Sequence, residues 1–417
     1  MYDPNLAEHL RPLLAESGSD EVVGFKDWEI RLRKKYEVTK LAEGSFGEVF
    51  KLRKRKTNAA AATDPEAHDG VIFKVVPLHI ESSSVSEDDC TTTSIEGIVR
   101  ESKALKAMAV LPGFTSFRQL HVVQGQYPDS FVEAFRDYQE SGKSCESQDP
   151  LSFSSDQVFA VIEMDDAGLD LDSLKAPSAF QVYDIFWSAV VILANAEEKV
   201  EFEHRDLHIG NICIKPWSAG GAIDIPGDAV SNMSTAPTSF LGLSGIKTTI
   251  IDYTLSRAAQ DPEKRDIIFD PFKDPTLFAA RSRKPEERRQ YNTYRKMQRC
   301  VRAAGLEARR GGPKPKKGKA DIWSLFVPKT NVAWLGYILY VLLLRAKGRI
   351  IPNSSEVAAS LQVRMYSSLK EVMAILDVRE DKLPASTREL LEMAESRQWL
   401  NEEDLMGLKE RLEAEAE

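Results

Sequence analysis

The chain has 417 residues, of which 42% are hydrophobic and 29% are charged, so it can bury a sizeable core and is not a wholly disordered chain. Its 55 Lys and Arg residues against 64 Asp and Glu residues give a formal net charge of −9. This charge argues against binding nucleic acid non-specifically through overall charge, and it allows a basic partner. The length allows two or three domains or one large bilobal enzyme.

The 4 cysteines lie far apart and form no Cys-x-x-Cys pair, so the sequence predicts neither a disulfide framework nor a zinc site. A reducing compartment fits this pattern best. The N-terminal residues lack the basic and then apolar stretches of a signal peptide. The longest apolar run, 332–344, is shorter than the roughly 20 residues that span a bilayer. We therefore expect a buried helix there and no membrane association.

The first part of the chain is predicted to be rich in strands. Residues 1–36 are polar and charged, with scattered apolar positions that fit one or two short helices. Apolar and β-branched residues beside glycines predict paired strands over 38–52 and 71–76. Ser94 then begins a pattern of apolar residues at helical spacing that runs to Met108.

The rest of the chain is predicted to be mainly helical. A short apolar strand at 159–163 is followed by a core helix over 179–198. A stretch rich in Gly, Ser and Pro at 218–244 reads as an insertion, and a strand resumes at 246–253. From about residue 284 onward the pattern is helical.

The first candidate site is a glycine-containing turn, Gly44-Ser45-Phe46-Gly47, followed by Val49. Glycines there let backbone N–H groups approach phosphates, and the valine can cover an aromatic base. Taken alone, such a pair of glycines is more often only a tight hairpin turn. Ala42 also stands where the first glycine of a full G-x-G-x-x-G pattern would lie.

The second candidate is Lys74, in the apolar strand Val71-Ile-Phe-Lys74. A lysine in such a strand usually extends to solvent at a sheet edge, whereas one buried beside polyphosphate needs a carboxylate partner. Glu101 on the following helix is the candidate partner and Glu96 is its rival. A solvated helix face is the alternative explanation for both glutamates.

The third signal is the most specific. Residues 204–211 read His-Arg-Asp-Leu-His-Ile-Gly-Asn, and Asp252 follows a later apolar strand. Asp206 can accept a hydroxyl proton, while Asn211 and Asp252 supply the hard oxygen ligands that Mg²⁺ prefers when it bridges phosphates. This spacing, behind a glycine turn and a strand lysine, matches the catalytic loop and the metal loop of protein kinases.

Together these segments resemble the haspin family, the atypical histone H3 kinases. The metal loop reads Asp252-Tyr-Thr254 rather than Asp-Phe-Gly, and His208 stands where most Ser/Thr kinases carry Lys. Asn331-Val-Ala-Trp-Leu335 also looks like a haspin segment, and no Ala-Pro-Glu follows the metal loop. The resemblance spans roughly residues 40–344.

The resemblance implies an α+β, bilobal protein-kinase-like fold with a β-rich N-lobe, an α-rich C-lobe and ATP bound between them. We expect these parts in the order N-terminal extension at 1–36, N-lobe at 37–163, C-lobe at 164–400 with insertions near 218–244 and 303–320, and acidic C-terminal helix at 401–417.

The resemblance also implies residue roles. Asp206 would be the catalytic base, with Lys74 and Glu101 completing the catalytic set. Met164 would be the gatekeeper and 165–168 the hinge that binds adenine. The residues expected to bind ATP are Ala42, Gly44, Ser45, Gly47, Val49, Lys74, Met164, Asp165, Gly168, Asp170, Asn211 and Asp252. The expected Mg²⁺ ligands are Asn211 and Asp252, and the expected substrate contacts are Asp170 and His208.

One departure from the family concerns the residue that anchors the catalytic loop. Haspins carry an Asp in the helix after the metal loop, where this chain has Asn292. Asp321, in Asp-Ile-Trp323, is the other candidate for this role, and the sequence leaves the choice open.

The β-branched Thr254, which restricts the backbone, leads to the hypothesis that the active arrangement needs no activation-loop phosphate.

The expected function is that of an ATP- and Mg²⁺-dependent serine/threonine kinase that phosphorylates a threonine in the histone H3 tail. The expected setting is the nucleus and mitotic chromosomes, with the protein acting as a monomer. An acidic cluster that includes Asp165, Asp166, Asp170 and Asp172 would receive the basic peptide. The basic stretch at 309–319 would contact the nucleosome or serve as a nuclear localisation signal, with a solvated insertion as its alternative. The rival functions are a kinase with a non-histone substrate and a pseudokinase scaffold.

Overall fold

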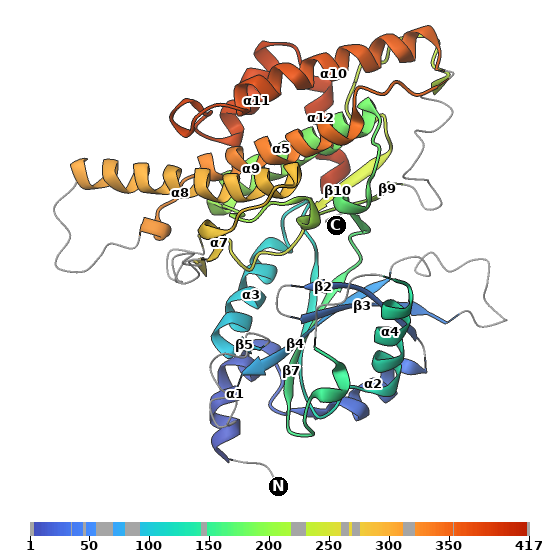
Figure 1. Ribbon diagram of the computed structural model, residues 1–417, viewed down its shortest axis with the longest axis vertical. Coiled ribbons are helices and arrows are strands. Elements are labelled where there is room, and N and C mark those ends of the chain that lie inside the picture. The colour runs from blue at the N-terminus through green and yellow to red at the C-terminus, as the bar shows by residue number, and fades with distance from the viewer. Residues whose placement is uncertain are drawn as a thin grey trace. The chain divides into compact units, whose positions relative to one another are not determined.

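The computed structural model describes residues 4–34, 36–44, 47–55, 70–79, 92–142, 148–217, 231–259, 267–268, 276–311, 322–352 and 354–414. The chain divides into two compact units, one formed by Met1–Ala109 and Thr115–Asp166 and the other by Val110–Phe114 and Ala167–Glu417 (Figure 1). The first unit is built on a sheet and the second is mainly helical, so the fold is the α+β, bilobal, protein-kinase-like class that the motifs predicted.

The first unit contains α1 (Pro4–Ser17), β1 (Val23–Gly24), α2 (Phe25–Arg33), β2 (Tyr36–Gly44), β3 (Gly47–Lys54), β4 (Val71–His79), β5 (Thr93–Ser94), α3 (Ile95–Met108), β6 (Phe117–Gln124), α4 (Asp129–Glu140), the 3-10 turn η2 (Pro150–Ser152) and β7 (Val158–Asp165). The strand order is β1-β6-β7-β4-β3-β2, with β5 beside β4. β4 is buried along nearly its whole length because apolar residues occupy both of its faces. Lys74 therefore lies in the interior of the sheet and not at an edge.

The N-terminal segment is part of the first unit and packs into its core. The Phe25 ring on α2 is fully buried and contacts the rings of Tyr127, Phe131 and Phe159 at centroid distances of 5.3, 5.7 and 5.4 Å. Trp28, one turn further along α2, packs on Phe25 and belongs to the same cluster. The segment expected to be an N-terminal extension thus supplies core residues to the sheet unit.

The packing of α2 gives a direct stability test. Phe25→Ala is expected to lower the free energy of unfolding by about 3–5 kcal/mol because it leaves a cavity between three aromatic rings. The neighbouring exposed change Lys26→Ala is expected to stay within about 0.5 kcal/mol of the wild type. Denaturant unfolding of the full chain measures both, and equal small effects would show that α2 does not belong to the core.

The second unit contains β8 (Leu169–Asp170), η3 (Leu171–Ser173), α5 (Ala179–Val200), η4 (Ile209–Asn211), β9 (Ile212–Pro216), β10 (Ile246–Ile250), β11 (Arg257–Ala258), β12 (Ile267–Ile268), α7 (Thr276–Ala279), α8 (Pro285–Gly311), η6 (Ile322–Ser324), α9 (Lys329–Ala346), α10 (Glu356–Leu376), η7 (Glu380–Lys382), α11 (Thr387–Ser396) and α12 (Glu402–Glu413). A small sheet of order β10-β9-β8 places the end of β10 beside η4. This hairpin positions the catalytic loop and the metal loop.

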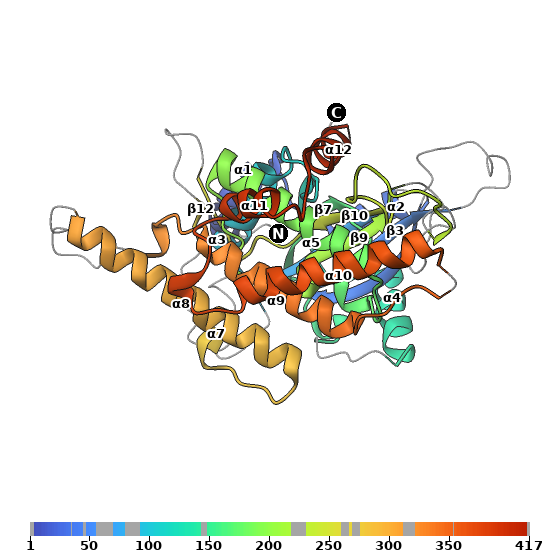
Figure 2. The ribbon, with the colours of Figure 1, turned by 90° about the horizontal axis from the view of Figure 1, so that it is seen from above.

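The core of the second unit is the helix α5, which contacts α9, α10, α11 and β10 (Figure 2). Among the described residues, α5 alone is long and apolar enough to cross a membrane by length and composition, but 89% of that stretch is buried inside the protein. The apolar run 332–344 lies within α9 and is buried, as predicted. Both are helices of the protein core.

Several predicted elements agree closely with the structure, and some elements were missed. The helix predicted from Ser94 is α3, whose first turn is capped by the Ser94 side chain accepting the Gly97 N–H at 3.2 Å. The sequence did not predict β6, α4 or β9. The predicted insertion at 303–320 is helical up to Gly311, because α8 continues that far. Residues 218–230 and 312–321 lie outside the described part of the chain.

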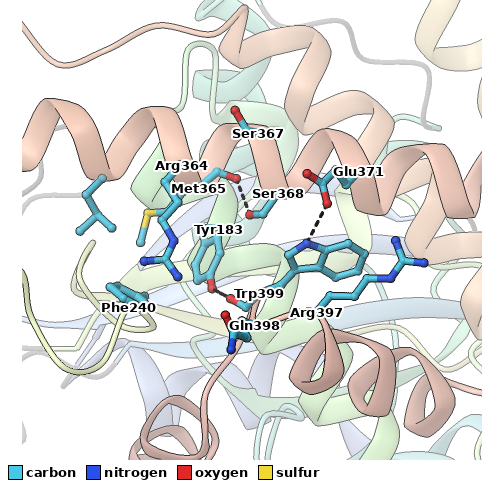
Figure 3. A pocket seen from close by; sticks show the side chains of 11 residues that line it. Tyr183, Phe240, Arg364, Met365, Ser367, Ser368, Glu371, Arg397, Gln398 and Trp399 are labelled. Atoms are coloured by element: carbon cyan, nitrogen blue, oxygen red, sulfur yellow. Dashed lines mark hydrogen bonds between the residues drawn. The ribbon is translucent and has the colours of Figure 1, made fainter.

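The last two helices are fixed to the rest of the second unit at a cavity of about 260 Å³ (Figure 3). The Tyr183 hydroxyl of α5 donates to the Trp399 carbonyl oxygen, and the Trp399 indole N–H donates to Glu371 of α10 at 3.2 Å. Arg364 and Arg397 lie over the rings of Phe240 and Trp399, respectively. The lining includes no predicted site residue, and these contacts attach the connection between α11 and α12 to the core.

Candidate active site

The buried lysine of the first unit has its carboxylate partner. Lys74 Nζ lies 2.5 Å from Glu101 Oε1 on α3, and the two side chains are only 9% and 8% exposed. Glu96, the rival, is exposed on the same helix. On β3, Val49 pairs with Lys74 on one side and with Ala42 of β2 on the other. The predicted phosphate-contacting lysine is therefore paired. Val49, predicted to cover the base, lies on the strand next to Lys74, and Ala42, predicted to bind ATP, lies on the strand after that.

The glycine-containing turn joins β2 to β3. Gly44 and Gly47 face each other across this hairpin, and Gly44 packs near the Lys74 side chain. A Cβ atom at Gly47 would collide with the Val75 carbonyl oxygen, so the close approach of β3 to β4 requires glycine there. Ser45 lies outside the described residues.

The predicted gatekeeper and hinge residues follow at the end of β7. Met164 lies on β7 between β4 and β6. The Asp165 carboxylate pairs with Arg118 of β6, and the Asp166 carboxylate pairs with Lys51 of β3. The negative charge of both hinge carboxylates is thus opposed by cations of the same unit.

The main part of the second unit begins at Ala167, within the predicted hinge. Gly168 has φ +98°, a conformation in which a side chain is strained, and a Cβ atom there would also strike the Ile214 carbonyl oxygen. Asp170 Oδ1 accepts hydrogen bonds from the Ser173 N–H at 2.9 Å and from its hydroxyl at 3.2 Å. Asp170 therefore caps the short turn η3, which fixes the position of its carboxylate.

The predicted base, Asp206, is held by two neighbours. The Tyr294 hydroxyl of α8 donates to Asp206 Oδ1, and His208 Nε2 lies 4.0 Å from Oδ2. His208 Nδ1 accepts the Gly210 N–H at 3.0 Å, so the Nε2 atom of a neutral His208 ring carries the proton. Burial raises the pKa of Asp206 to about 6, against the opposite effects of His208 and Tyr294. At neutral pH the group is mainly a carboxylate that can accept a proton. Tyr294 was not predicted, because no sequence motif marks its contact with Asp206.

The two predicted metal ligands lie at the same end of the β9–β10 hairpin. The Ile251 N–H donates to the Asn211 carbonyl oxygen at 3.0 Å. Asn211 Nδ2 donates to the Asp206 carbonyl oxygen at 2.8 Å, which leaves its Oδ1 as the amide atom suited to a cation. Asp252 Oδ1 accepts from the Thr254 N–H at 3.1 Å and from its hydroxyl at 2.6 Å. Thr254 thus orients the metal-loop carboxylate.

These donors fit Mg²⁺ bound together with a nucleotide. Within the described ranges, no group of three or more His, Cys, Asp and Glu side chains is placed to hold a metal by itself. Mg²⁺ in phosphoryl-transfer sites commonly takes only one or two protein ligands, and phosphates and water complete its shell. One carboxylate and one amide oxygen, from Asp252 and Asn211, match that requirement.

The hydroxyl of Thr254 provides a test of the metal loop. Thr254→Val keeps the side-chain shape and removes the hydrogen bond to Asp252, so the Mg²⁺ concentration for half-maximal activity is expected to rise roughly 10-fold. Thr254→Ser keeps the hydroxyl and is expected to stay near the wild type. A magnesium titration of ATP turnover compares them, and equal requirements in the two variants would contradict this role.

Two residues of these loops have left-handed backbone conformations that side chains rarely adopt. Arg205 has φ +66° and Asp252 has φ +61°, each costing about 1–3 kcal/mol. Arg205 is fully buried and donates to Glu203 Oε1 at 3.2 Å and to the Trp323 carbonyl oxygen at 2.7 Å. In many kinases an arginine pairs with a phosphate on the activation loop. In this protein Arg205 pairs with Glu203 and the Trp323 carbonyl oxygen instead.

Activity is therefore expected not to depend on phosphorylation of the protein itself. Phosphatase treatment, verified by intact-mass measurement, should leave peptide-kinase activity within about twofold of the untreated sample, because the partners of Arg205 are internal. Loss of most activity after treatment would contradict this expectation.

The catalytic loop is anchored by Asn331 of α9. Asn331 Oδ1 accepts the His204 N–H at 3.0 Å, and its Nδ2 donates to the Phe202 carbonyl oxygen at 2.8 Å and to Glu197 Oε1 at 2.9 Å. All four residues are buried. The Asn331 amide thus bonds to the backbone N–H of His204 and to the backbone carbonyl oxygen of Phe202, on either side of Glu203. The Glu197 carboxylate of α5 holds this amide in place.

Asn292, one of the two residues considered for this role from the sequence, does not form this anchor in the structure. Asn292 Oδ1 instead accepts a hydrogen bond from Arg295, one turn along α8, at 2.7 Å. Asp321 lies outside the described residues. Asn331 was visible in the sequence as the first residue of Asn-Val-Ala-Trp, but nothing local showed that its side chain reaches the catalytic loop.

The protonation states of this region follow from burial. Burial raises the pKa of Glu197 to about 7, while hydrogen bonds from Thr387 and Asn331 act in the opposite direction. Burial lowers the pKa of His204 to about 4, so this ring is neutral at physiological pH. Its Nδ1 accepts the Asp206 N–H at 3.3 Å and its Nε2 donates to the Ile251 carbonyl oxygen at 3.0 Å. His204 therefore links the catalytic loop to Ile251, the residue before Asp252.

The Asn331 network predicts a rescue between two variants. Asn331→Leu removes the hydrogen bonds to three buried polar groups and is expected to lower the free energy of unfolding by about 2–5 kcal/mol. Asn331→Asp keeps the acceptor for His204 but places a carboxylate against Glu197. Adding Glu197→Gln supplies a donor, so the double variant should recover at least about 1 kcal/mol relative to Asn331→Asp alone. Denaturant unfolding measures each variant, and a double variant no more stable than Asn331→Asp contradicts the network.

These features together define the class of protein. A buried Lys–Glu pair links β4 to α3 in the sheet unit, and the helical unit carries Asp206, Asn211 and Asp252 on adjoining loops. This combination is that of a protein-kinase-like fold.

Comparison with known proteins identifies the family. The model of the haspin-like kinase domain matches residues 20–406, so the chain belongs to the haspin-like kinase family. It is 30% identical over 348 residues to a serine/threonine-protein kinase haspin homolog of Drosophila melanogaster, covering 81% of this chain and 52% of that protein. It is 27% identical over 351 residues to a haspin homolog of Schizosaccharomyces pombe, covering 82% and 61%. The chain thus spans little more than half the length of these relatives.

Among the solved structures that match is that of a viral kinase. The kinase PK-1 of Cydia pomonella granulovirus is 14% identical, with a TM-score of 0.31, and the match covers 88% of this chain and 96% of that one.

Proposed function

We propose that this protein transfers the γ-phosphoryl group of ATP to a serine or threonine hydroxyl of a protein, and that its substrate is a threonine in the amino-terminal tail of histone H3. The observation that carries the reaction is the arrangement around Asp206, a partly buried base that is held by Tyr294 and lies next to the hairpin end that carries Asn211 and Asp252. Membership of the haspin-like kinase family supports the same reaction.

Each residue has a chemical task in this proposal. Asp206 orients the substrate hydroxyl and accepts its proton, and Tyr294 and His208 hold the carboxylate in place. Lys74, fixed by Glu101, directs its ammonium toward phosphate oxygens. Asn211 and Asp252 would hold Mg²⁺, which supplies positive charge to the phosphates when it is bound. The chain's own contribution is thus positioning and preorganised charge.

A cavity beside the catalytic loop supports a basic peptide as the substrate. It has a volume of about 570 Å³ and lies in the second unit. His208 lines it together with three carboxylates, those of Asp172, Glu286 and Glu287. We call it the acidic cavity. A cationic side chain next to the acceptor hydroxyl would find complementary charge there.

The cellular setting follows from the substrate in this proposal. A kinase of histone tails acts in the nucleus and on mitotic chromosomes. Arg309 and Arg310 are exposed near the end of α8, at the start of the basic stretch 309–319, which is proposed to contact the nucleosome. The protein is proposed to act as a monomer.

A peptide panel tests the function. The wild-type protein is incubated with ATP, Mg²⁺ and histone-tail peptides, and the phosphorylated residue is mapped by mass spectrometry. We expect strong preference for the histone H3 amino-terminal peptide, with phosphate on threonine. Asp206→Asn should lower turnover by about 10²–10⁴-fold and leave ATP affinity within about twofold, because it removes the base and not the nucleotide contacts.

The outcomes separate the alternatives. Efficient phosphorylation of other peptides without preference for the histone H3 tail would favour a kinase with a different substrate. Failure to consume ATP with any substrate would favour a pseudokinase scaffold. Unchanged turnover in Asp206→Asn would contradict the assignment of the base.

A further inference from the structure

A fixed cation outside the lining of the acidic cavity pairs with two of its carboxylates. Arg345, in the last turn of α9, donates from Nε to Glu286 Oε1 at 3.1 Å and from Nη2 to Glu286 Oε2 at 2.6 Å. The same Nη2 donates to Asp172 Oδ1 at 2.8 Å. One guanidinium therefore bridges two of the three carboxylates that line the cavity, and its contact with Glu286 has the bidentate geometry of strong Arg–carboxylate pairs.

Arg345 is held firmly in this position. Its Nη1 donates to the carbonyl oxygens of Leu171, Asp172 and Leu174, at 2.9, 3.1 and 3.2 Å. Its side chain is only 12% exposed, whereas those of Asp172 and Glu286 are 63% and 31% exposed. The guanidinium thus lies behind the carboxylates, which face the cavity while their charge is opposed from the protein side.

The third carboxylate of the acidic cavity, that of Glu287, is paired with a more exposed cation. Glu287 Oε1 lies 2.7 Å from Lys284 Nζ, and these side chains are 41% and 79% exposed. An exposed pair of this kind contributes little and is easily rearranged by an arriving ligand. Arg345 is therefore the fixed cation behind the cavity, whereas Lys284 is an exposed cation that lines it.

We propose that Arg345 is a positioning residue that sets the charge preference of the substrate site, by holding Asp172 and Glu286 and offsetting part of their attraction for a basic substrate residue. This inference rests on the proposed kinase function. The carboxylates attract a cationic side chain, and the largely buried guanidinium behind them repels it. The cavity consequently discriminates between basic and neutral residues less strongly than its three carboxylates would alone.

The test compares peptides that differ in one charge. A threonine peptide carries a single Arg, moved through the positions on either side of the acceptor, and each member has a partner with Gln at that position. The ratio of kcat/KM for the Arg peptide to that for the Gln peptide measures the charge preference. The same ratio for affinity is measured without ATP by fluorescence anisotropy.

Arg345→Gln removes the cation and keeps hydrogen-bonding capacity, so the ratio is expected to rise about 5- to 20-fold at the position that reaches the cavity. Arg345→Lys keeps the charge and should stay within about threefold of the wild type. Glu286→Gln should lower the ratio by a similar factor.

The matched control is Arg388→Gln, which removes the same charge from α11. Arg388 is 67% exposed and does not line the cavity, so this variant should leave the ratio unchanged.

An unchanged or lower ratio in Arg345→Gln overturns the inference, since a purely structural role would lower activity toward both peptides alike. If Arg345→Gln does not fold, the double variant Glu286→Gln with Arg345→Gln replaces it, because its neutral side chains can bond to each other. This double variant should show a higher ratio than Glu286→Gln alone, and an equal ratio overturns the inference. If no peptide is phosphorylated while the affinity ratios shift as described, the proposed function fails and the role of Arg345 stands.

Discussion

The catalytic loop depends on one buried amide. The Asn331 side chain bonds to the His204 N–H, the Phe202 carbonyl oxygen and the Glu197 carboxylate, and all of these belong to buried residues. Because each buried polar group left unpaired costs about 1–3 kcal/mol, the loop cannot shift without losing several such bonds at once. The same hydrogen bonds hold Arg205 in its strained backbone conformation. The neutral ring of His204 in turn connects the Asp206 N–H to the carbonyl oxygen of Ile251, the residue before Asp252.

The sequence contained the chemical residues of the candidate site but not their supports. Asp206, Asn211 and Asp252 could be predicted because the chemistry requires fixed spacings within short loops, and Lys74 because it interrupts an apolar strand. Asn331 and Tyr294 reach the catalytic loop from α9 and α8, far along the chain, and their contacts depend on helix packing that leaves no local pattern. The strand β6 was not predicted because buried and exposed residues do not alternate regularly along it.

The structure shows that several acidic residues behind the net charge of −9 are paired with cations. Three of the acidic residues predicted to face a basic peptide are paired within their own unit: Asp165 with Arg118, Asp166 with Lys51 and Asp172 with Arg345. Acidity in the sequence is therefore not the same as a free acidic surface. Under the proposed function, substrate selection depends on how far these internal cations offset the carboxylates, and we propose that the largely buried guanidinium of Arg345 sets most of that balance in the acidic cavity.

The most direct measurement of the central claim is hydrogen exchange of the His204 amide in the wild-type chain. If Asn331 holds the loop as described, this amide exchanges as slowly as the core amides of α5 and α9, because it opens only when the second unit unfolds. Exchange orders of magnitude faster than that of α5 and α9, by local opening of residues 203–208, would show that the loop moves independently and would contradict the account.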